Sequence, residues 1–314
     1  MTETGIMASP PLRLGWLDVA RGVAVIAMVI YHFAWDLSHF GLVETDIGLD
    51  PAWKRFAQAI AASFLAIAGV AQAVALRNGI DRLAFSKRMA LVGGAALAVT
   101  GASYAAFPDR FIFFGILHCI ALASVIGLAF RAAPFGLTLA AGLAVLALPL
   151  VLRAEAFNAP ALIWLGLGTK VPLTNDFVPV FPWVGWFLAG LALGQRLRPV
   201  AAPSARRPSL IARLGRWSLP VYLIHQPVLF ALFHAGAATG LLTLTPEVKT
   251  FVQSCTIDCE TSGGAERVCL SACACAARTL RDRAVWPRVV SGETGGEDEA
   301  ELTMVGRRCF EAAQ

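Results

Sequence analysis

The stretch of residues 17–41 constrains the fold of this chain more than any other. It reads LDVARGVAVIAMVIYHFAWDLSHFG, a long apolar run with ionisable groups at each end and none in the middle. A helix needs about 20 predominantly apolar residues to cross a bilayer. Ionisable groups at the rims of such a span are costly to bury, which makes them candidates for function.

The composition indicates a chain with several membrane spans. Charged residues make up 15% of the 314 residues, against about 25% in an average soluble domain. The mean hydropathy of +0.65 points the same way. The basic residues behind the net charge of +5 cluster in short loops between apolar runs, which is typical of membrane topology. We therefore expect the lipid bilayer as a partner, and no nucleic acid.

Apolar runs recur along the chain, and each predicts one membrane-spanning helix. They cover residues 16–35, 53–76, 89–107, 111–130, 135–152, 179–197 and 217–242. Under strict alternation the basic loops at 77–88 and 196–216 fall on one side of the membrane. Basic loops face the cytoplasm, so the N-terminus is predicted inside and the C-terminus outside. The predicted fold class is all-α, a polytopic integral membrane helix bundle of seven spans, and the first run is too long for a cleaved signal peptide.

The residues after position 242 change in character and predict a small cysteine-rich helical hairpin. Thr245, Pro246 and Glu247 form a typical helix start. A glycine-containing turn at 262–264 separates a first helical segment from a second. Six of the seven cysteines lie in this tail, whereas Cys119 lies in the fourth run and is expected to be a small buried hydrophobe.

The spacing of four tail cysteines predicts disulfide bonds. Cys255 and Cys259 are four residues apart, as are Cys269 and Cys273, and residues four apart share a helical face. Two such faces can be joined as Cys255–Cys273 and Cys259–Cys269. The predicted topology places the tail in the periplasm, where disulfides persist. Zinc held by four thiolates is the alternative, and sequence alone does not fix the connectivity.

These patterns divide the chain into four predicted parts. They are a disordered cytoplasmic N-terminus at 1–15, a transmembrane domain at 16–242, a periplasmic cysteine-rich hairpin at 243–290 and a flexible tail at 291–314. The last part is predicted to be flexible because residues 291–301 are acidic and rich in glycine.

One end of the first span carries a polar cluster. His32 and Asp36 are four residues apart, and His39 follows three later, so a continuous helix would place all three on one face. A carboxylate beside an imidazole fixes its tautomer, as a general base requires. The alternatives are that these residues anchor the span at the membrane rim, or that two histidines and one aspartate bind a metal ion.

Three further residues are candidates for binding a cofactor. Arg21 lies three residues after Asp18, either as an ion pair or as a ligand for a phosphate-bearing donor. His118 and His225 lie inside apolar runs, where an ionisable side chain is energetically costly. For both, a hydrogen bond to a neighbouring helix is as good an explanation as chemistry.

Three segments resemble a known family. LDVARGVAVIAMVIYHF is similar to the first span of bacterial membrane proteins related to the catalytic domain of heparan-α-glucosaminide N-acetyltransferase. RFIFFGILHCIALAS resembles that family's fourth-span motif, and SLPVYLIHQPV resembles a late histidine-containing span of membrane acyltransferases. The resemblance covers residues 13–242 and implies that an acetyl group passes from cytoplasmic acetyl-CoA to a glucosamine amine across the membrane.

The resemblance also implies roles for individual residues. The family has an asparagine eleven residues after its arginine, and His32 stands at that position here. His39 is the nearest candidate for the family's catalytic histidine. His118-Cys119 stands where the family has Gln-Arg, so an arginine is missing from this chain. We expect Arg21, with the basic loops, to hold the phosphates of CoA.

The predicted function is therefore acetyl transfer at the bacterial inner membrane. Acetyl-CoA would be the co-substrate, and an amine or hydroxyl of a sugar-containing envelope component on the periplasmic side would be the acceptor, with His32, Asp36 and His39 catalytic and no metal required. A transporter or flippase that uses intramembrane histidines, and a non-catalytic scaffold for the tail, are the alternatives. The sequence leaves a homodimer open.

Overall fold

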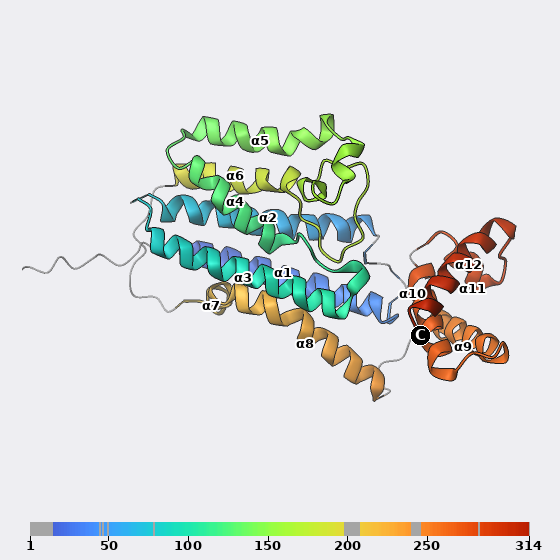
Figure 1. Ribbon diagram of the computed structural model, residues 1–314. Helices are drawn as coiled ribbons and strands as arrows, with labels where there is room; N and C mark the ends of the chain where they lie inside the picture. The colour runs from blue at the N-terminus through green and yellow to red at the C-terminus, as the bar shows by residue number, and fades with distance from the viewer. Residues whose placement is uncertain are drawn as a thin grey trace, which may run out of the picture. The chain divides into compact units, whose positions relative to one another are not determined.

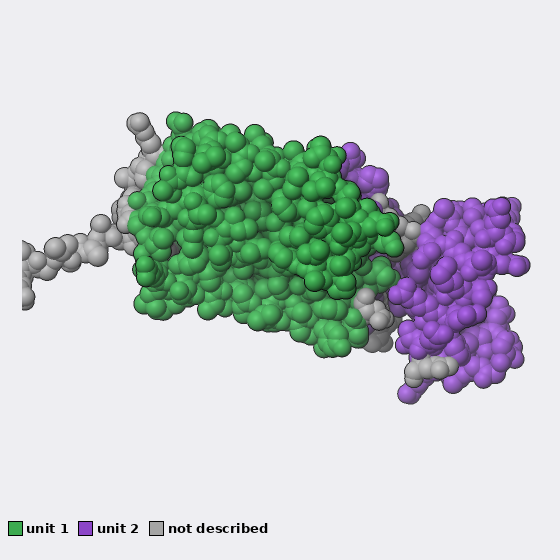
Figure 2. All heavy atoms as spheres, turned by 45° about the horizontal axis from the view of Figure 1, so that its top comes forward, with its two compact units in different colours: residues 1–28, 58–224 green, residues 29–57, 225–314 purple. Residues whose placement is uncertain are grey.

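The structure is a computed structural model that describes residues 15–43, 45, 47–48, 50–77, 79–197, 208–239, 246–281 and 283–313 (Figure 1). Two compact units are distinguished in the chain, unit 1 comprising residues 1–28 and 58–224 and unit 2 comprising residues 29–57 and 225–314 (Figure 2). The predicted disorder before residue 15, part of the basic loop around 198–207 and the predicted helix cap at Thr245 lie outside the described residues.

Each predicted apolar run corresponds to one helix. The helices are α1 Gly15–His39, α2 Pro51–Ala75, α3 Arg82–Ala106, α4 Ile116–Ala129, α5 Phe135–Val151, α6 Val180–Arg196 and α8 Ser218–Ala238, with a short α7 at Leu210–Arg216. By length and hydropathy, α1, α2, α3 and α8 can each cross a membrane, and α4 and α5 are shorter apolar helices. The prediction of an all-helical fold is confirmed for the described residues, which include four candidate membrane spans. The number of seven crossings and their direction remain predictions.

Helix α3 begins earlier than its apolar run indicates. Asp81 caps its start, because the Asp81 carboxylate accepts a hydrogen bond of 2.9 Å from the backbone N–H of Ala84. The basic residues predicted to form a loop at 82–88 are therefore helical. Arg88 therefore lies about two turns inside α3, whereas the sequence predicted it in a loop.

Close helix packing through glycine organises unit 1. Helices α5 and α6 form the most extensive helix pair, and they lie side by side in Figure 1. A side chain at Gly185 of α6 would collide with the backbone carbonyl of Gly142 in α5, and one at Gly190 would collide with Ala66 of α2. Small residues allow such approach between membrane helices. Leu65, Phe187, Leu188 and Leu191 fill the core between these helices.

The loop between α5 and α6 is folded onto the start of α4. It contains two short 3-10 helices, η2 at Glu155–Asn158 and η3 at Ile163–Leu165, and a third, η1, precedes α4 at Pro108–Arg110. A bridge joins Phe114 to Phe177, and the N–H of Val178 donates to the carbonyl of Phe114 over 3.1 Å. Helix α4 starts at Ile116 and not at 111, so His118 lies in its first turn.

The tail of unit 2 contains more structure than a hairpin. Its helices are α9 Pro246–Thr261, α10 Glu266–Arg281, α11 Trp286–Ser291 and α12 Gly296–Glu311. Disulfides join Cys255 to Cys273 and Cys259 to Cys269, the two pairs that the four-residue spacing indicates. A third disulfide, Cys275–Cys309, ties α12 to α10. A separate apolar core surrounds Val252, Leu280 and Trp286.

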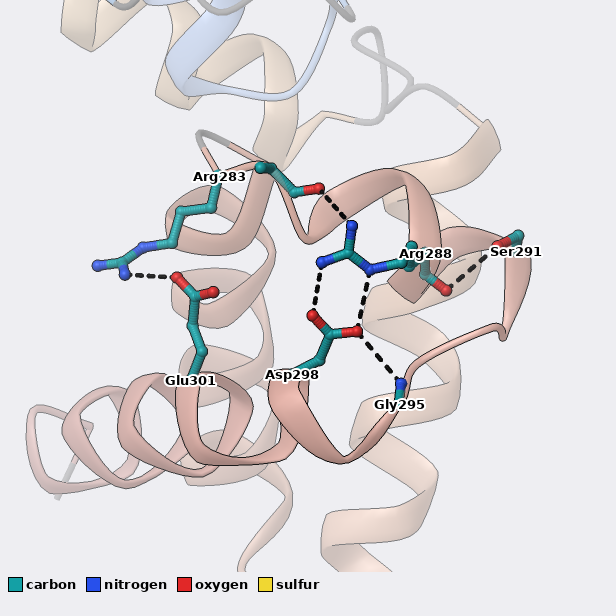
Figure 3. A network of polar contacts seen from close by, with 7 residues as sticks. Arg283, Arg288, Ser291, Gly295, Asp298 and Glu301 are labelled. Carbon is teal, nitrogen blue, oxygen red and sulfur yellow. Dashed lines mark hydrogen bonds and ion pairs between the residues drawn. The ribbon is translucent and has the colours of Figure 1, made fainter.

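The segment predicted to be flexible, 291–314, is largely helical. Helix α12 has Glu297, Asp298 and Glu299 in its first turn, where acidic side chains favour the helix dipole. Figure 3 shows both carboxylate oxygens of Asp298 bound by one edge of the Arg288 guanidinium. Nε donates over 2.9 Å and Nη2 over 2.5 Å. The acidic stretch was predicted to be a flexible link. In the structure its acidic residues lie in the first turn of α12, and Asp298 among them binds Arg288.

Candidate active site

Two imidazoles from helices α1 and α8 meet in unit 2. Helix α1 persists beyond Trp35 to His39, so the predicted continuous face exists. The ring centroids of His32 and His225 are 4.8 Å apart, and the two rings stand edge to face at 65°. The structure therefore brings together a predicted catalytic residue and a predicted cofactor-binding residue that are far apart in the sequence.

Asp36 lies one turn after His32 but is held by a different partner from the one predicted. Its Oδ1 accepts a hydrogen bond of 2.7 Å from Nε2 of Gln226, the residue after His225. The Asp36 side chain is fully buried, and among the described residues its Oδ2 has no hydrogen-bond partner. A buried carboxylate with an unsatisfied oxygen is costly, which makes Asp36 a candidate for function. Gln226 is a site residue that the sequence did not single out.

His39 occupies an aromatic setting. Its ring stacks on Trp35 at 4.9 Å and 14°, and it also contacts Phe230 and Phe40 at 5.3 and 5.4 Å. Stacking of this kind fixes the ring and buries its faces. The geometry thus favours His32 over His39 as the imidazole free to face a reacting group.

Arg21 forms part of an ion cluster in unit 1. Its Nη1 lies 3.3 Å from Oδ1 of Asp18, and Nε of Arg216 lies 3.0 Å from the other oxygen of the same carboxylate. Glycines at the contact allow α1 and α7 to approach closely, since a side chain at Gly22 or Gly215 would collide with the backbone of the other helix. The carboxylate of Asp18 therefore pairs with two arginines, so these three side chains carry a net positive charge.

A cavity of about 200 Å³ adjoins this cluster and is lined by residues of unit 1 alone. Arg21, Arg88, Ser218 and Tyr222 provide its polar groups, and apolar side chains of α2, α3, α4 and α8 line the rest. Arg88 takes part in none of the ion pairs formed by the described residues. A cavity with two guanidinium groups and an apolar wall suits a ligand that has both an anionic and an apolar part.

His118 has a structural role in the geometry observed. Its Nδ1 accepts from the N–H of Gly115 at 3.3 Å, and its Nε2 lies 3.3 Å from Oγ1 of Thr100. The Thr100 hydroxyl donates to the carbonyl of Ile112 over 2.7 Å, so Nε2 of His118 is the donor to Thr100. Both ring nitrogens are thereby used within unit 1, at the start of α4. The geometry therefore agrees with the alternative stated from the sequence, in which His118 is a hydrogen-bonded histidine within the packed helices.

Asp176 was not singled out by the sequence, although it is central to this part of unit 1. Its Oδ2 accepts a hydrogen bond of 3.0 Å from the N–H of Ile116, the first residue of α4. Burial raises the pKa of Asp176 to about 6, against the lowering effect of that hydrogen bond. The residue caps a helix 60 positions earlier, a relation that no local pattern in the sequence can reveal.

Four of the described helices are long and apolar enough to cross a membrane, and two of these, α1 and α8, bring together paired imidazoles and a buried carboxylate, as expected of a membrane protein with a polar site among its helices. The family model described as heparan-alpha-glucosaminide N-acetyltransferase, catalytic, matches residues 13–227. That match covers more than half of the chain, and the chain belongs to this family of membrane acetyltransferases. No curated protein and no solved structure matches the chain significantly.

Proposed function

We propose that the protein transfers an acetyl group from cytoplasmic acetyl-CoA to an amine or hydroxyl of an envelope sugar on the periplasmic side of the bacterial inner membrane. The observation that carries this proposal is the pairing of His32 with His225, beside the buried Asp36–Gln226 hydrogen bond. Membership of the family supports acetyl transfer as the reaction class. The donor, the acceptor and the direction across the membrane are our inference.

His32 is the proposed general base. It takes the proton of the acceptor amine or hydroxyl as the acceptor attacks the thioester carbonyl, the C–S bond breaks, and CoA leaves as a thiolate that is then protonated. Gln226 holds Asp36, and the contact with His225 fixes the orientation of the His32 ring. Base catalysis of this kind contributes about 10²–10⁴-fold to a rate.

The arginine-lined cavity of unit 1 is the proposed binding site for CoA. Arg21 and Arg88 would bind phosphate oxygens, because guanidinium groups form paired hydrogen bonds to phosphate. The apolar wall would accept the pantetheine arm. Helix α1 carries both Arg21 in its first half and His32 in its second half, so one helix contributes to donor binding and to acceptor activation.

Purified protein in lipid nanodiscs, supplied with radiolabelled acetyl-CoA and glucosamine as a probe acceptor, tests the proposal. Wild-type protein should produce labelled N-acetylglucosamine, and His32→Ala should reduce the rate by about 10²-fold or more. His234→Ala is a matched control, because this exposed imidazole also lies on α8 but makes its ring contacts, among the described residues, with Phe40 and Phe230. If wild-type protein neither binds CoA nor acetylates any hexosamine, the enzymatic proposal is wrong.

A further inference from the structure

The disulfide-bonded tail, which lies beyond the family match at 13–227, makes a specific polar contact with the end of α1 in unit 2. Arg281, the last residue of α10, donates from Nη1 to the carbonyl of Val43 over 2.9 Å. Its Nη2 donates to the carbonyl of Ser38 and, at 3.0 Å, to the Ser38 hydroxyl. One guanidinium thus connects the tail to α1 and to the loop that follows it.

This contact lies at the C-terminal end of α1, where the Ser38 carbonyl also accepts a hydrogen bond of 3.0 Å from the N–H of Gly41. The last carbonyls of a helix have no partner within the helix and carry the negative end of its dipole, so a cation placed there stabilises the helix end. Ser38 is buried, and its hydroxyl also accepts a hydrogen bond of 3.3 Å from the N–H of Ile47. Arg281 and the α1–α2 loop therefore share Ser38 as an anchor.

The neighbours of Ser38 on α1 are the residues of the candidate site. Asp36 lies two residues before it and His39 directly after it. A helix end that frays would move Asp36 relative to Gln226, since their hydrogen bond needs α1 to remain helical up to that point.

We propose that Arg281 is a positioning residue for acetyl transfer: the tail uses it to hold the end of α1 in the geometry that keeps Asp36 on Gln226 and His32 beside His225. This inference rests on the proposed function and gives the tail a role in the reaction. The three disulfides join α10, which ends at Arg281, to α9 and α12. Arg281 does not touch the reacting atoms and acts through Ser38.

The test compares Arg281→Ala and Arg281→Lys with Arg267→Ala in the full chain in nanodiscs. Arg267 is an exposed arginine on the same helix, α10. Arg281→Ala should lower kcat by about tenfold with KM for acetyl-CoA unchanged, as expected when charge-assisted hydrogen bonds are lost. Arg281→Lys, which keeps the charge, should restore part of kcat, and Arg267→Ala should match wild type.

Amide hydrogen exchange of the peptide covering residues 37–48 gives a readout that does not require activity. Arg281→Ala should speed exchange in this peptide by about tenfold, whereas Arg267→Ala should not. Unchanged exchange would show that the contact does not hold α1. Faster exchange with unchanged kcat would show that the contact is structural only, leaving acetyl transfer intact. If wild-type protein shows no acetyl transfer, the proposed function and the positioning role both fail.

Discussion

Gln226 donates a hydrogen bond of 2.7 Å from Nε2 to Oδ1 of Asp36, across 190 positions of sequence. It joins α1 to α8 at the point where both carry an imidazole. The partner of the carboxylate is thus an amide and not a histidine, which changes the role expected for Asp36 from orienting an imidazole to joining two helices.

Replacing Gln226 with leucine should destabilise the protein. The fully buried Asp36 would then lose its hydrogen bond, at a cost of about 1–3 kcal/mol in the free energy of unfolding. Asp36→Asn keeps an acceptor for Gln226 and should remain close to wild type in stability. Denaturant unfolding in detergent measures both variants, and a Gln226→Leu protein as stable as wild type would contradict this account.

His32 and His39 should respond differently to substitution. His32→Ala should reduce kcat by about 10²-fold or more with little change in unfolding temperature, as expected for a general base. His39→Ala should lower the unfolding temperature, because its ring stacks on Trp35, and should affect kcat less. Acetyl-transfer assays and thermal unfolding of both variants show which one loses more kcat and which one has the lower unfolding temperature. If His39→Ala lost more kcat than His32→Ala, the general base would be His39 and not His32.

Arg88→Gln should weaken binding of acetyl-CoA. Loss of one guanidinium–phosphate contact should raise KM or Kd about tenfold. Arg82→Gln serves as the control, because Arg82 is exposed, lies on the same helix and does not line the cavity. Isothermal titration with CoA measures the difference. Equal affinities for both variants would exclude this cavity as the phosphate site.

The tail should lose stability in acid. The hydrogen bonds from Arg288 hold the pKa of Asp298 down at about 2, below about 3.9 for an unperturbed aspartate. Because the folded-state pKa is the lower one, the stabilisation is present above pH ~4 and is lost as the pH falls towards about 2. Pepsin digestion of the full chain over this interval should release tail peptides increasingly at the acid end. Asp298→Asn should be cleaved readily even at pH ~4, and a wild-type tail that resists pepsin equally throughout would refute the prediction.

The sequence predicts those features that depend on nearby residues. Hydropathy locates the helices, and cysteines four apart indicate Cys255–Cys273 and Cys259–Cys269. Cys275 and Cys309 differ, since 34 positions separate them and the intervening acidic stretch is typical of a linker. The early start of α3 depends on a single capping carboxylate, Asp81, in a stretch dominated by basic charge.

Only part of the candidate site was predicted, because the sequence shows which residues share a helix face but not which helices pack together. Helical spacing places His32 and Asp36 on one face, but only the packing of α1 against α8 brings Gln226 and His225 to them. The sequence did not indicate that Arg88 lines a cavity, because basic residues beside an apolar run are typical of a loop that flanks a membrane span. His118 resembled an intramembrane functional residue, since the true start of α4 at Ile116 cannot be read from apolar residues alone.

The disulfide between Cys275 and Cys309 closes a covalent loop that contains the end of α10, all of α11 and nearly all of α12. A single proteolytic cut inside that loop would not separate the chain, because the bond still joins the two fragments. Such a nicked molecule would migrate as intact protein on a non-reducing gel and split into two bands only after reduction. The tail can therefore be cleaved once without being shed.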